Sequence, residues 1–133
     1  MLDEQPKTEC RITHDGVPLR GDILRYPGGQ LGIQFYAAES IPEKEIYAGS
    51  PWDRPTINIP ELKIAPDQLW VRTYDEHEGF LEAMVAAGVI ALVLPAMSTR
   101  SGEVLCRLLV PAPSIDGRSR HNLIIEVEDA PLF

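Results

Sequence analysis

The chain has few cysteines, few basic residues and no long apolar run, and each shortage excludes a class of protein. Its only two cysteines, Cys10 and Cys106, lie far apart and form no CxxC pair, so they indicate neither a disulfide framework nor a zinc site. The longest apolar stretch, residues 86–97, is too short to span a bilayer, and the polar start of the chain predicts no signal peptide. We therefore expect a soluble, cytoplasmic protein with no membrane partner.

Positive charge is outweighed by negative charge. The 12 Lys and Arg residues face 20 Asp and Glu residues, which gives a formal net charge of −8. An acidic surface repels a phosphate backbone, so the composition disfavours nucleic acid as a partner. Such a surface attracts a basic partner, or a protein surface that normally holds nucleic acid, although the same charge also serves solubility alone.

Sequence signatures of catalysis and phosphate binding are missing as well. Residues 98–102 carry hydroxyl groups without the glycines and the lysine of a phosphate-binding loop, and no GxSxG motif occurs. The three histidines, His14, His77 and His121, are widely scattered, and their spacing supports neither a catalytic triad nor a three-ligand metal site. We expect no catalytic residue, no metal and no cofactor.

What the chain does contain is a series of short apolar segments separated by proline and glycine. Residues 19–26 and 31–37 flank Pro27-Gly28-Gly29 and predict a β-hairpin with one buried face. Residues 49–55 hold two prolines and a glycine, which excludes a central strand, and residues 40–47 suit a loop or a short turn of helix. Further strands are expected at residues 56–59, 68–73, 89–94, 103–110 and 123–127.

One helix is expected, at residues 76–87. Asp75 has the side chain of an N-cap, Glu78 completes a capping-box pattern, and Gly88 suits the C-terminal end. The residues at helical spacing on its apolar face are Phe80, Leu81, Met84 and Val85. The sequence therefore predicts an α+β fold, a twisted antiparallel sheet of about five or six strands with the helix packed on one face.

The composition along the chain predicts a single folded domain with two flanking segments. Residues 1–16 are expected to form a flexible N-terminal arm, and residues 17–110 a single α+β domain. Residues 111–133 are a C-terminal extension that adds an edge strand if residues 123–127 pair with the sheet.

The densest group of ionisable side chains is Asp75-Glu76-His77-Glu78. A histidine between carboxylates can act as a general base or bind a metal ion. Consecutive residues at a helix start point in different directions, however, and the expected helix cap already accounts for two of the carboxylates. We therefore interpret the group as having a structural role, and we keep His77 as a candidate contact residue for a ligand or partner.

Two aromatic segments are further candidates for ligand or partner binding. Trp52 and Arg54 lie in a proline-bounded loop that could present an aromatic anchor and a guanidinium group, or could fold back over the sheet. Trp70, Arg72 and Tyr74 alternate with aliphatic residues on an expected strand. They form an exposed stripe if the aliphatic set is buried, and the opposite register buries Trp70 instead.

Four segments carry a resemblance to a known family. YPGGQLGIQFY, PTINIPELKIAPDQLWV, YDEHEGFLEAMVAAGVI and a strand ending in CRLL follow one another over the middle two-thirds of the chain. Their order resembles small proteins of unknown function that are encoded on bacterial plasmids, prophages and other mobile elements. The resemblance implies a mobile-element accessory protein and no particular activity. Residues 49–55 are longer than the corresponding loop of that family, so no role can be transferred to them.

These observations favour a non-catalytic accessory or binding protein that acts through protein–protein contacts. An acidic mimic of nucleic acid that inhibits a host factor is a narrower hypothesis of the same class. One alternative is a small hydrolase that uses His77 and its neighbouring carboxylates. The other is a homo-oligomeric structural protein, such as a homodimer formed through an open sheet edge.

Overall fold

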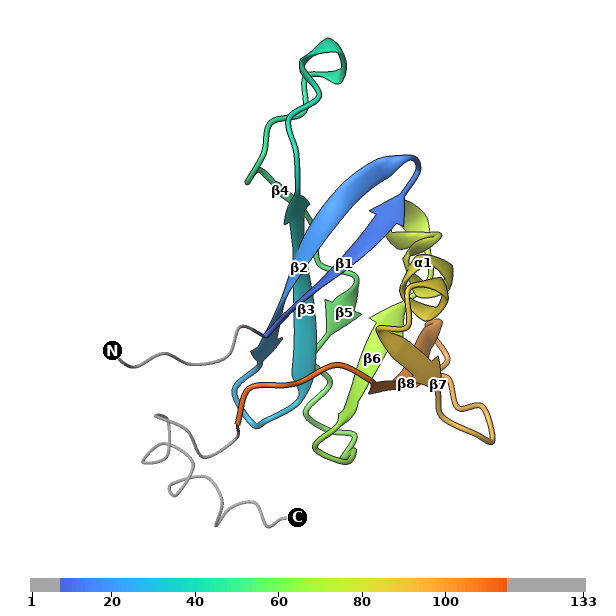
Figure 1. Ribbon diagram of the computed structural model, residues 1–133. Coiled ribbons are helices and arrows are strands. Elements are labelled where there is room, and N and C mark those ends of the chain that lie inside the picture. Colours follow the sequence, from blue (N-terminus) through green and yellow to red (C-terminus); the bar gives the residue numbers. More distant parts are fainter. Residues whose placement is uncertain (1–7, 115–133) are drawn as a thin grey trace, which may run out of the picture.

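Residues 8–114, which the computed structural model describes, form two antiparallel sheets and one α-helix around a shared core (Figure 1). The expected α+β class with antiparallel strands is confirmed. The expected strand at residues 123–127 lies outside the described residues. No helix within residues 8–114 is long and apolar enough to cross a membrane.

The first sheet has the strand order β1-β2-β3-β4. Its strands are β1 (Glu9–His14), β2 (Val17–Arg25), β3 (Leu31–Ala37) and β4 (Pro51–Asp53). The predicted hairpin is confirmed as β2 and β3, because Ile23 pairs with Ile33 and the N–H of Tyr26 donates to the carbonyl of Gln30 at 2.8 Å. Gly28 and Gly29 adopt positive φ angles in the turn, which is why glycine stands there.

The second sheet has the strand order β5-β6-β8-β7. Its strands are β5 (Thr56–Ile57), β6 (Gln68–Arg72), β7 (Ile90–Leu92) and β8 (Glu103–Leu108). β6 and β8 are the central pair, and Leu69, Val71 and Cys106 on their inner face are fully buried.

The chain passes from one sheet to the other at Arg54-Pro55. β4 pairs with β3 while β5, two residues later, pairs with β6. At this corner the N–H of Ile33 donates to the hydroxyl oxygen of Thr56 at 3.0 Å, so a side chain replaces a strand-to-strand bond. The prediction of a single sheet is therefore wrong, because a proline that lacks an N–H breaks the ladder between the two sheets. The expected loop at residues 49–55 also contains the short edge strand β4.

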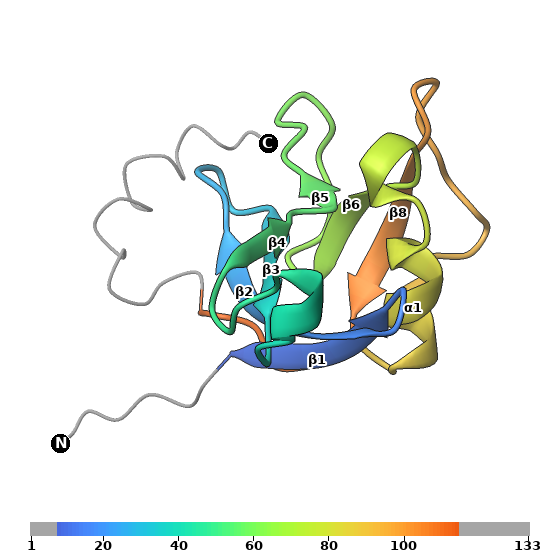
Figure 2. The same cartoon turned by 90° about the horizontal axis from the view of Figure 1, so that it is seen from above.

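The core lies between the two sheets and is closed by the helix. β3 contributes Leu31, Ile33 and Phe35, and the helix contributes Phe80 and Met84, all at most 1 % exposed. Burying each such side chain stabilises the fold by roughly 1.5–3 kcal/mol. Figure 2 shows α1 (Phe80–Ala86) beside the sheets, where it contacts β1 of one sheet and β7 of the other. The helix thus joins the two sheets and does not lie flat across one face.

The helix begins later than predicted. Asp75 has a φ of 55° and makes no capping hydrogen bond, and it opens a separate 3-10 turn, η2 (Asp75–His77). Gly79, with a φ of 91°, then reverses the backbone before α1 starts. The predicted capping box is therefore wrong, and Val85 of the predicted apolar face is 43 % exposed. The predicted end is confirmed, since Gly88 has a φ of 76° directly after the helix.

Both flanking segments contribute to the folded domain. Residues 9–14 of the expected N-terminal arm are β1, and Ile12 in this strand is buried in the core. After β8, the N–H of Leu109 donates to the carbonyl of Val89 at 2.8 Å, and Arg25 donates to the carbonyl of Pro113 at 2.9 Å. The folded unit therefore extends beyond residues 17–110 in both directions.

Candidate functional site

His77 and Asp53 form a buried pair that connects η2 to the end of β4. The Nδ1 atom of His77 lies 2.8 Å from a carboxylate oxygen of Asp53, and the side chains are only 6 % and 14 % exposed. The Nε2 atom of His77 lies 3.5 Å from a carboxylate oxygen of Glu76, whose side chain is 74 % exposed. The turn at Asp75 and Gly79 directs the imidazole inward, a placement that the predicted continuous helix would not allow.

An Asp–His pair of this kind is a component of many hydrolase sites, but within residues 8–114 no nucleophile contacts it. A hydrolase of the triad type needs a hydroxyl or thiol nucleophile within hydrogen-bond reach of the free imidazole nitrogen. Among the described residues, the only polar contacts of His77 side-chain nitrogens are those to Asp53 and Glu76. The arrangement ties η2 to the first sheet.

A second buried carboxylate, Glu103 at the start of β8, is held by two hydroxyl groups. The hydroxyl of Tyr74 donates to it at 2.5 Å, and the hydroxyl of Thr99 donates to its other oxygen. Burial by itself raises the pKa of Glu103, but these bonds favour the charged form, and together with its backbone N–H and nearby Arg72 they bring the pKa below its ordinary value. The bond to Glu103 raises the pKa of Tyr74.

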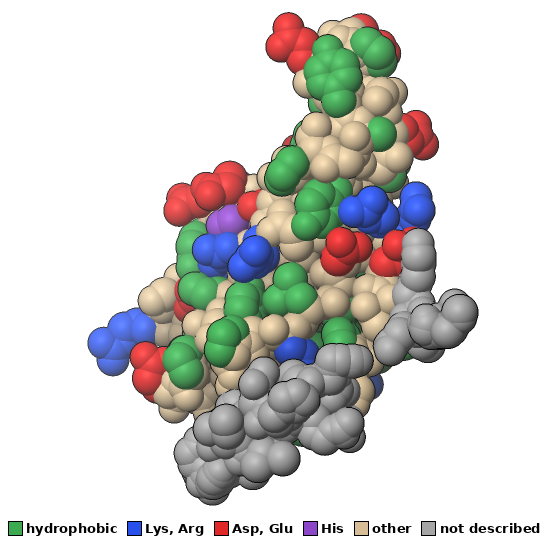
Figure 3. Space-filling view, turned by 90° about the vertical axis from the view of Figure 1, so that its left-hand side faces the viewer, with side chains coloured by type: hydrophobic (Ala, Val, Ile, Leu, Met, Phe, Trp, Pro, Cys, Tyr) green, Lys and Arg blue, Asp and Glu red, His purple; other side chains and the backbone are tan. Residues whose placement is uncertain are grey.

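Arg54 and Arg72 meet at the corner between the two sheets. A terminal nitrogen of Arg72 donates to the carbonyl of Arg54, and Nε of Arg54 donates to the side chain of Gln34 at 3.0 Å. The guanidinium group of Arg54 also lies 5.8 Å from the centre of the Tyr26 ring. In Figure 3, acidic and basic side chains lie next to each other around a histidine on this side of the molecule, and they do not form a surface of one sign.

The structure thus brings four of the predicted contact residues, Arg54, Arg72, Tyr74 and His77, into one polar region. The two tryptophans are not part of its surface. Trp70 is 4 % exposed, so no stripe of exposed aromatic residues forms on β6, and Trp52 is half-buried and packs against the core. Whether the polar region contacts a partner stays a prediction.

Cys10, Cys106 and His14 are engaged in packing. Burial raises the pKa of Cys10 to about 11 and that of Cys106 to about 12, so both thiols remain protonated near neutral pH. His14 stacks on Phe80 with ring centres 3.9 Å apart and contacts the carbonyl of Glu78. Within residues 8–114, no three His, Cys, Asp or Glu side chains are grouped to hold a metal ion.

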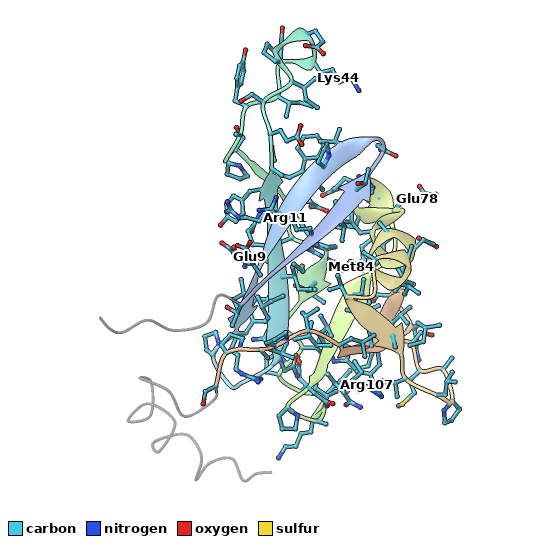
Figure 4. The ribbon with its side chains drawn as sticks, in the orientation of Figure 1. Glu9, Arg11, Lys44, Glu78, Met84 and Arg107 are labelled. Atoms are coloured by element: carbon cyan, nitrogen blue, oxygen red, sulfur yellow. The ribbon has the colours of Figure 1, made fainter. Side chains whose placement is uncertain are left out.

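The connection between β3 and β4, residues 38–50, is largely exposed, and we call it the projecting arm. It rises beyond the sheets in Figure 1, and Figure 4 shows Lys44 near its tip. Ile41 and Ile46 exchange backbone hydrogen bonds at 2.7 and 3.2 Å and pack against the core, and the arm contains the 3-10 turn η1 (Pro42–Lys44). At the base, Gly49 donates to the carbonyl of Ala37 at 2.8 Å.

Sequence reasoning left residues 40–47 as either a loop or a short turn of helix, and it did not predict the projection. One signal was available, because residues 38–50 greatly exceed the usual hairpin loop of about 2–5 residues. A long connection with its own hydrogen bonds is frequently functional. The exposed side chains of the arm include Tyr47, which is 54 % exposed, and a set of charged residues, namely Glu39, Glu43, Lys44 and Glu45.

A groove of about 430 Å³ lies beside β1, away from His77. Residues 11–13 of β1 form one wall, the alanines Ala83, Ala86 and Ala87 of α1 form another, and the base of the arm contributes Ala38 and Glu39. Its lining residues include one cation and one anion, Arg11 and Glu39.

Comparison of the chain with protein-family models, with curated proteins and with solved structures finds no match. The functional assignment therefore rests on the geometry of the described residues. The resemblance to proteins of plasmids and prophages stays a prediction.

Proposed function

We propose that this protein is a non-catalytic binding protein that acts through protein–protein contacts, with the projecting arm as its contact element. The observation that carries the proposal is the combination of order and exposure in residues 38–50. The arm closes on itself through the Ile41–Ile46 bridge, yet most of its side chains face solvent.

The construction of the arm lowers the cost of binding. A loop that is already held in one conformation loses little entropy when a partner docks. Tyr47 supplies a large amphipathic side chain of the type that dominates interface energies. Glu45 at the end of η1 has a φ of 58°, so the tip has a defined backbone shape and is not an arbitrary loop.

The charge of the arm favours a partner with basic groups. Three glutamates, Glu39, Glu43 and Glu45, stand against the single lysine Lys44 within residues 38–50. Opposite charges across a contact steer the encounter and select between partners more than they add affinity. The proposed partner therefore presents an apolar pocket for Tyr47 bordered by Lys or Arg.

The surroundings of His77 support a binding protein over a small hydrolase. His77 is 5 % exposed, and each ring nitrogen faces a carboxylate. A hydrolase would require Glu76 to leave and a nucleophile to enter. From the resemblance of its sequence motifs, we also propose that the protein is an accessory protein of a mobile element that contacts a host factor.

The test compares the full chain with arm variants as bait in a host lysate. We expect Tyr47→Ala to weaken the binding of a protein retained by the wild type by about 30-fold or more, since hot-spot truncations cost about 2 kcal/mol or more. The double variant Glu43→Lys with Glu45→Lys should also weaken the binding of that protein. Leu94→Ala is the matched control, because Leu94 is an exposed apolar residue, 77 % exposed, on a different loop.

The comparison of the variants shows whether the arm or another surface binds the retained protein. A retained protein that binds all variants equally would overturn the role of the arm. Circular dichroism of each variant confirms that the fold is kept. Release of the retained protein by salt would support the charge argument.

A further inference from the structure

The outer edge of β1 presents unpaired backbone groups. β1 is the first strand of its sheet, so only one of its sides is paired. The N–H of Ile23 donates to the carbonyl of Thr8 at 2.9 Å, and the register of the pair places Glu9 opposite Asp22. Because antiparallel bonding alternates along a strand, residues 8, 10 and 12 face β2 and residues 9, 11 and 13 point their N–H and C=O groups to the open side. Such an edge is a template for another strand.

The two charged side chains of this edge are opposite in sign. Glu9 and Arg11 stand on the same face of β1, with Nη2 of Arg11 3.6 Å from a carboxylate oxygen of Glu9 (Figure 4). The Arg11 side chain is 65 % exposed, so this contact within one chain leaves it accessible. α1 packs near the other end of the strand, where Phe80 stacks on His14.

We propose that two copies of the chain form a symmetric dimer by antiparallel pairing of their β1 strands, with Glu9 opposite Arg11 of the partner subunit. This inference goes beyond the proposed function of the arm. The pairing joins the β1-β2-β3-β4 sheets of both subunits into one continuous sheet across a two-fold axis.

Charge selects this register from the alternatives. Residues 9, 11 and 13 of β1 have backbone groups on the open side, so a two-fold axis that pairs at least two of them with the partner strand passes through Cys10, Arg11 or Ile12. An axis at Arg11 sets Arg11 against the same residue of the partner subunit, which places like charges opposite each other and is destabilising. An axis at Ile12 sets Arg11 against Thr13 of the partner subunit and leaves Glu9 beyond the end of the partner's strand, so it forms no pair of opposite charge. The axis at Cys10 forms two Glu9–Arg11 pairs.

Space beside the strand permits the approach of the second copy. The groove next to residues 11–13 is lined on the helix side by Ala83, Ala86 and Ala87, whose short side chains leave space beside these residues. The projecting arm, residues 38–50, emerges after β3 and carries none of the pairing groups. Arm variants are therefore expected to leave the dimer unchanged, so failure of one proposal does not imply failure of the other.

The dimer is tested by sedimentation velocity over a wide concentration range at low salt. We expect the wild-type mass to rise from monomer to dimer, and Arg11→Glu or Glu9→Arg to raise the dimer dissociation constant at least tenfold. The double variant Glu9→Arg with Arg11→Glu restores opposite pairs and should return the dissociation constant to within a fewfold of the wild type. A monomer at every concentration, or a double variant as weak as the single ones, would overturn the proposal.

Amide hydrogen exchange provides a readout that needs no substitution. The N–H groups of Glu9 and Arg11 should become protected as the protein concentration rises, while those on the unpaired side of other edge strands stay unchanged. Protection that does not depend on concentration would mean that a segment of the same chain covers the edge. Protection that appears only when a second protein is added would assign the edge to a different partner. Either result would overturn the dimer.

Discussion

At Glu103, hydrogen bonds offset the unfavourable burial of a carboxylate. Glu103 is 6 % exposed, and desolvation of a carboxylate is costly unless it is bonded. The hydroxyls of Tyr74 and Thr99 donate to its carboxylate oxygens, and its own N–H donates to the hydroxyl oxygen of Thr99 at 3.1 Å. The result is a fixed connection between the start of β8, the end of β6 and the loop before β8.

At the scale of a single residue, we predict that the free energy of unfolding depends on pH and that this dependence requires Glu103. Its folded pKa lies below the ordinary value of 4.5, so its contribution is present above that pH and is lost as the pH falls through the lower folded value. Glu103→Gln should lower the free energy of unfolding by about 1–3 kcal/mol at pH 7 and flatten its acid dependence. Urea titrations between pH 7 and pH 3 measure both effects.

The control for this prediction is Glu82→Gln on the exposed face of α1. It should leave both the stability and its acid dependence close to the wild type. An unchanged acid dependence in Glu103→Gln would contradict the proposed balance of burial and hydrogen bonding.

At the scale of elements, the segment between β6 and α1 decides where the polar side chains point. Gly79 adopts a φ of 91°, and a Cβ atom there would lie 3.2 Å from Nε2 of His14. This conformation lets η2 end and α1 begin in a new direction, which places His77 against Asp53 and Phe80 against His14. A continuous helix could not satisfy both contacts.

We predict that Gly79→Ala lowers the free energy of unfolding more than alanine does at a glycine whose φ is similar but whose added Cβ contacts nothing. A left-handed conformation costs a residue with a Cβ roughly 1–2 kcal/mol. Gly49 in the projecting arm has a similar φ of 88° and nothing within 4 Å of its added Cβ, so Gly49→Ala is the matched control. Thermal unfolding compares the two variants, and equal losses would show that the contact with His14 carries no cost.

At the scale of the whole molecule, Arg25 joins the turn of its own hairpin to two segments that are distant in sequence. Its guanidinium group donates to the carbonyl groups of Gly29, Pro66 and Pro113 at 2.8 to 2.9 Å. These residues belong to the β2–β3 turn, the approach to β6 and the segment after β8. Burial lowers the pKa of Arg25, yet a guanidinium group stays charged at any physiological pH.

We therefore predict that Arg25→Ala weakens the connection between the sheets. The loss should be on the order of 2 kcal/mol, because hydrogen bonds from a charged group are among the stronger ones. Arg20→Ala is the control, since Arg20 pairs with Asp22 at the surface at 3.4 Å and should cost at most about 1 kcal/mol. Chemical denaturation gives both values, and an Arg25 loss no larger than the Arg20 loss would contradict this role.

The sequence by itself determined the features that depend on near neighbours. The hairpin around Pro27-Gly28-Gly29 follows from alternation and turn chemistry, and Gly88 marks the helix end because few other residues adopt its conformation. The α+β class follows from many short strands and one helical segment. The projecting arm was visible only as an unusually long connection.

Tertiary structure alone decided the division into two sheets and the partners of the polar residues. Asp53 meets His77, and Arg54 meets Arg72, only because the chain changes sheets at Pro55. Asp75 resembles a helix cap in sequence, but burying His77 and Phe80 together outweighs the local preference for a cap. Contacts between residues distant in sequence depend on how whole elements pack, and no local pattern records that packing.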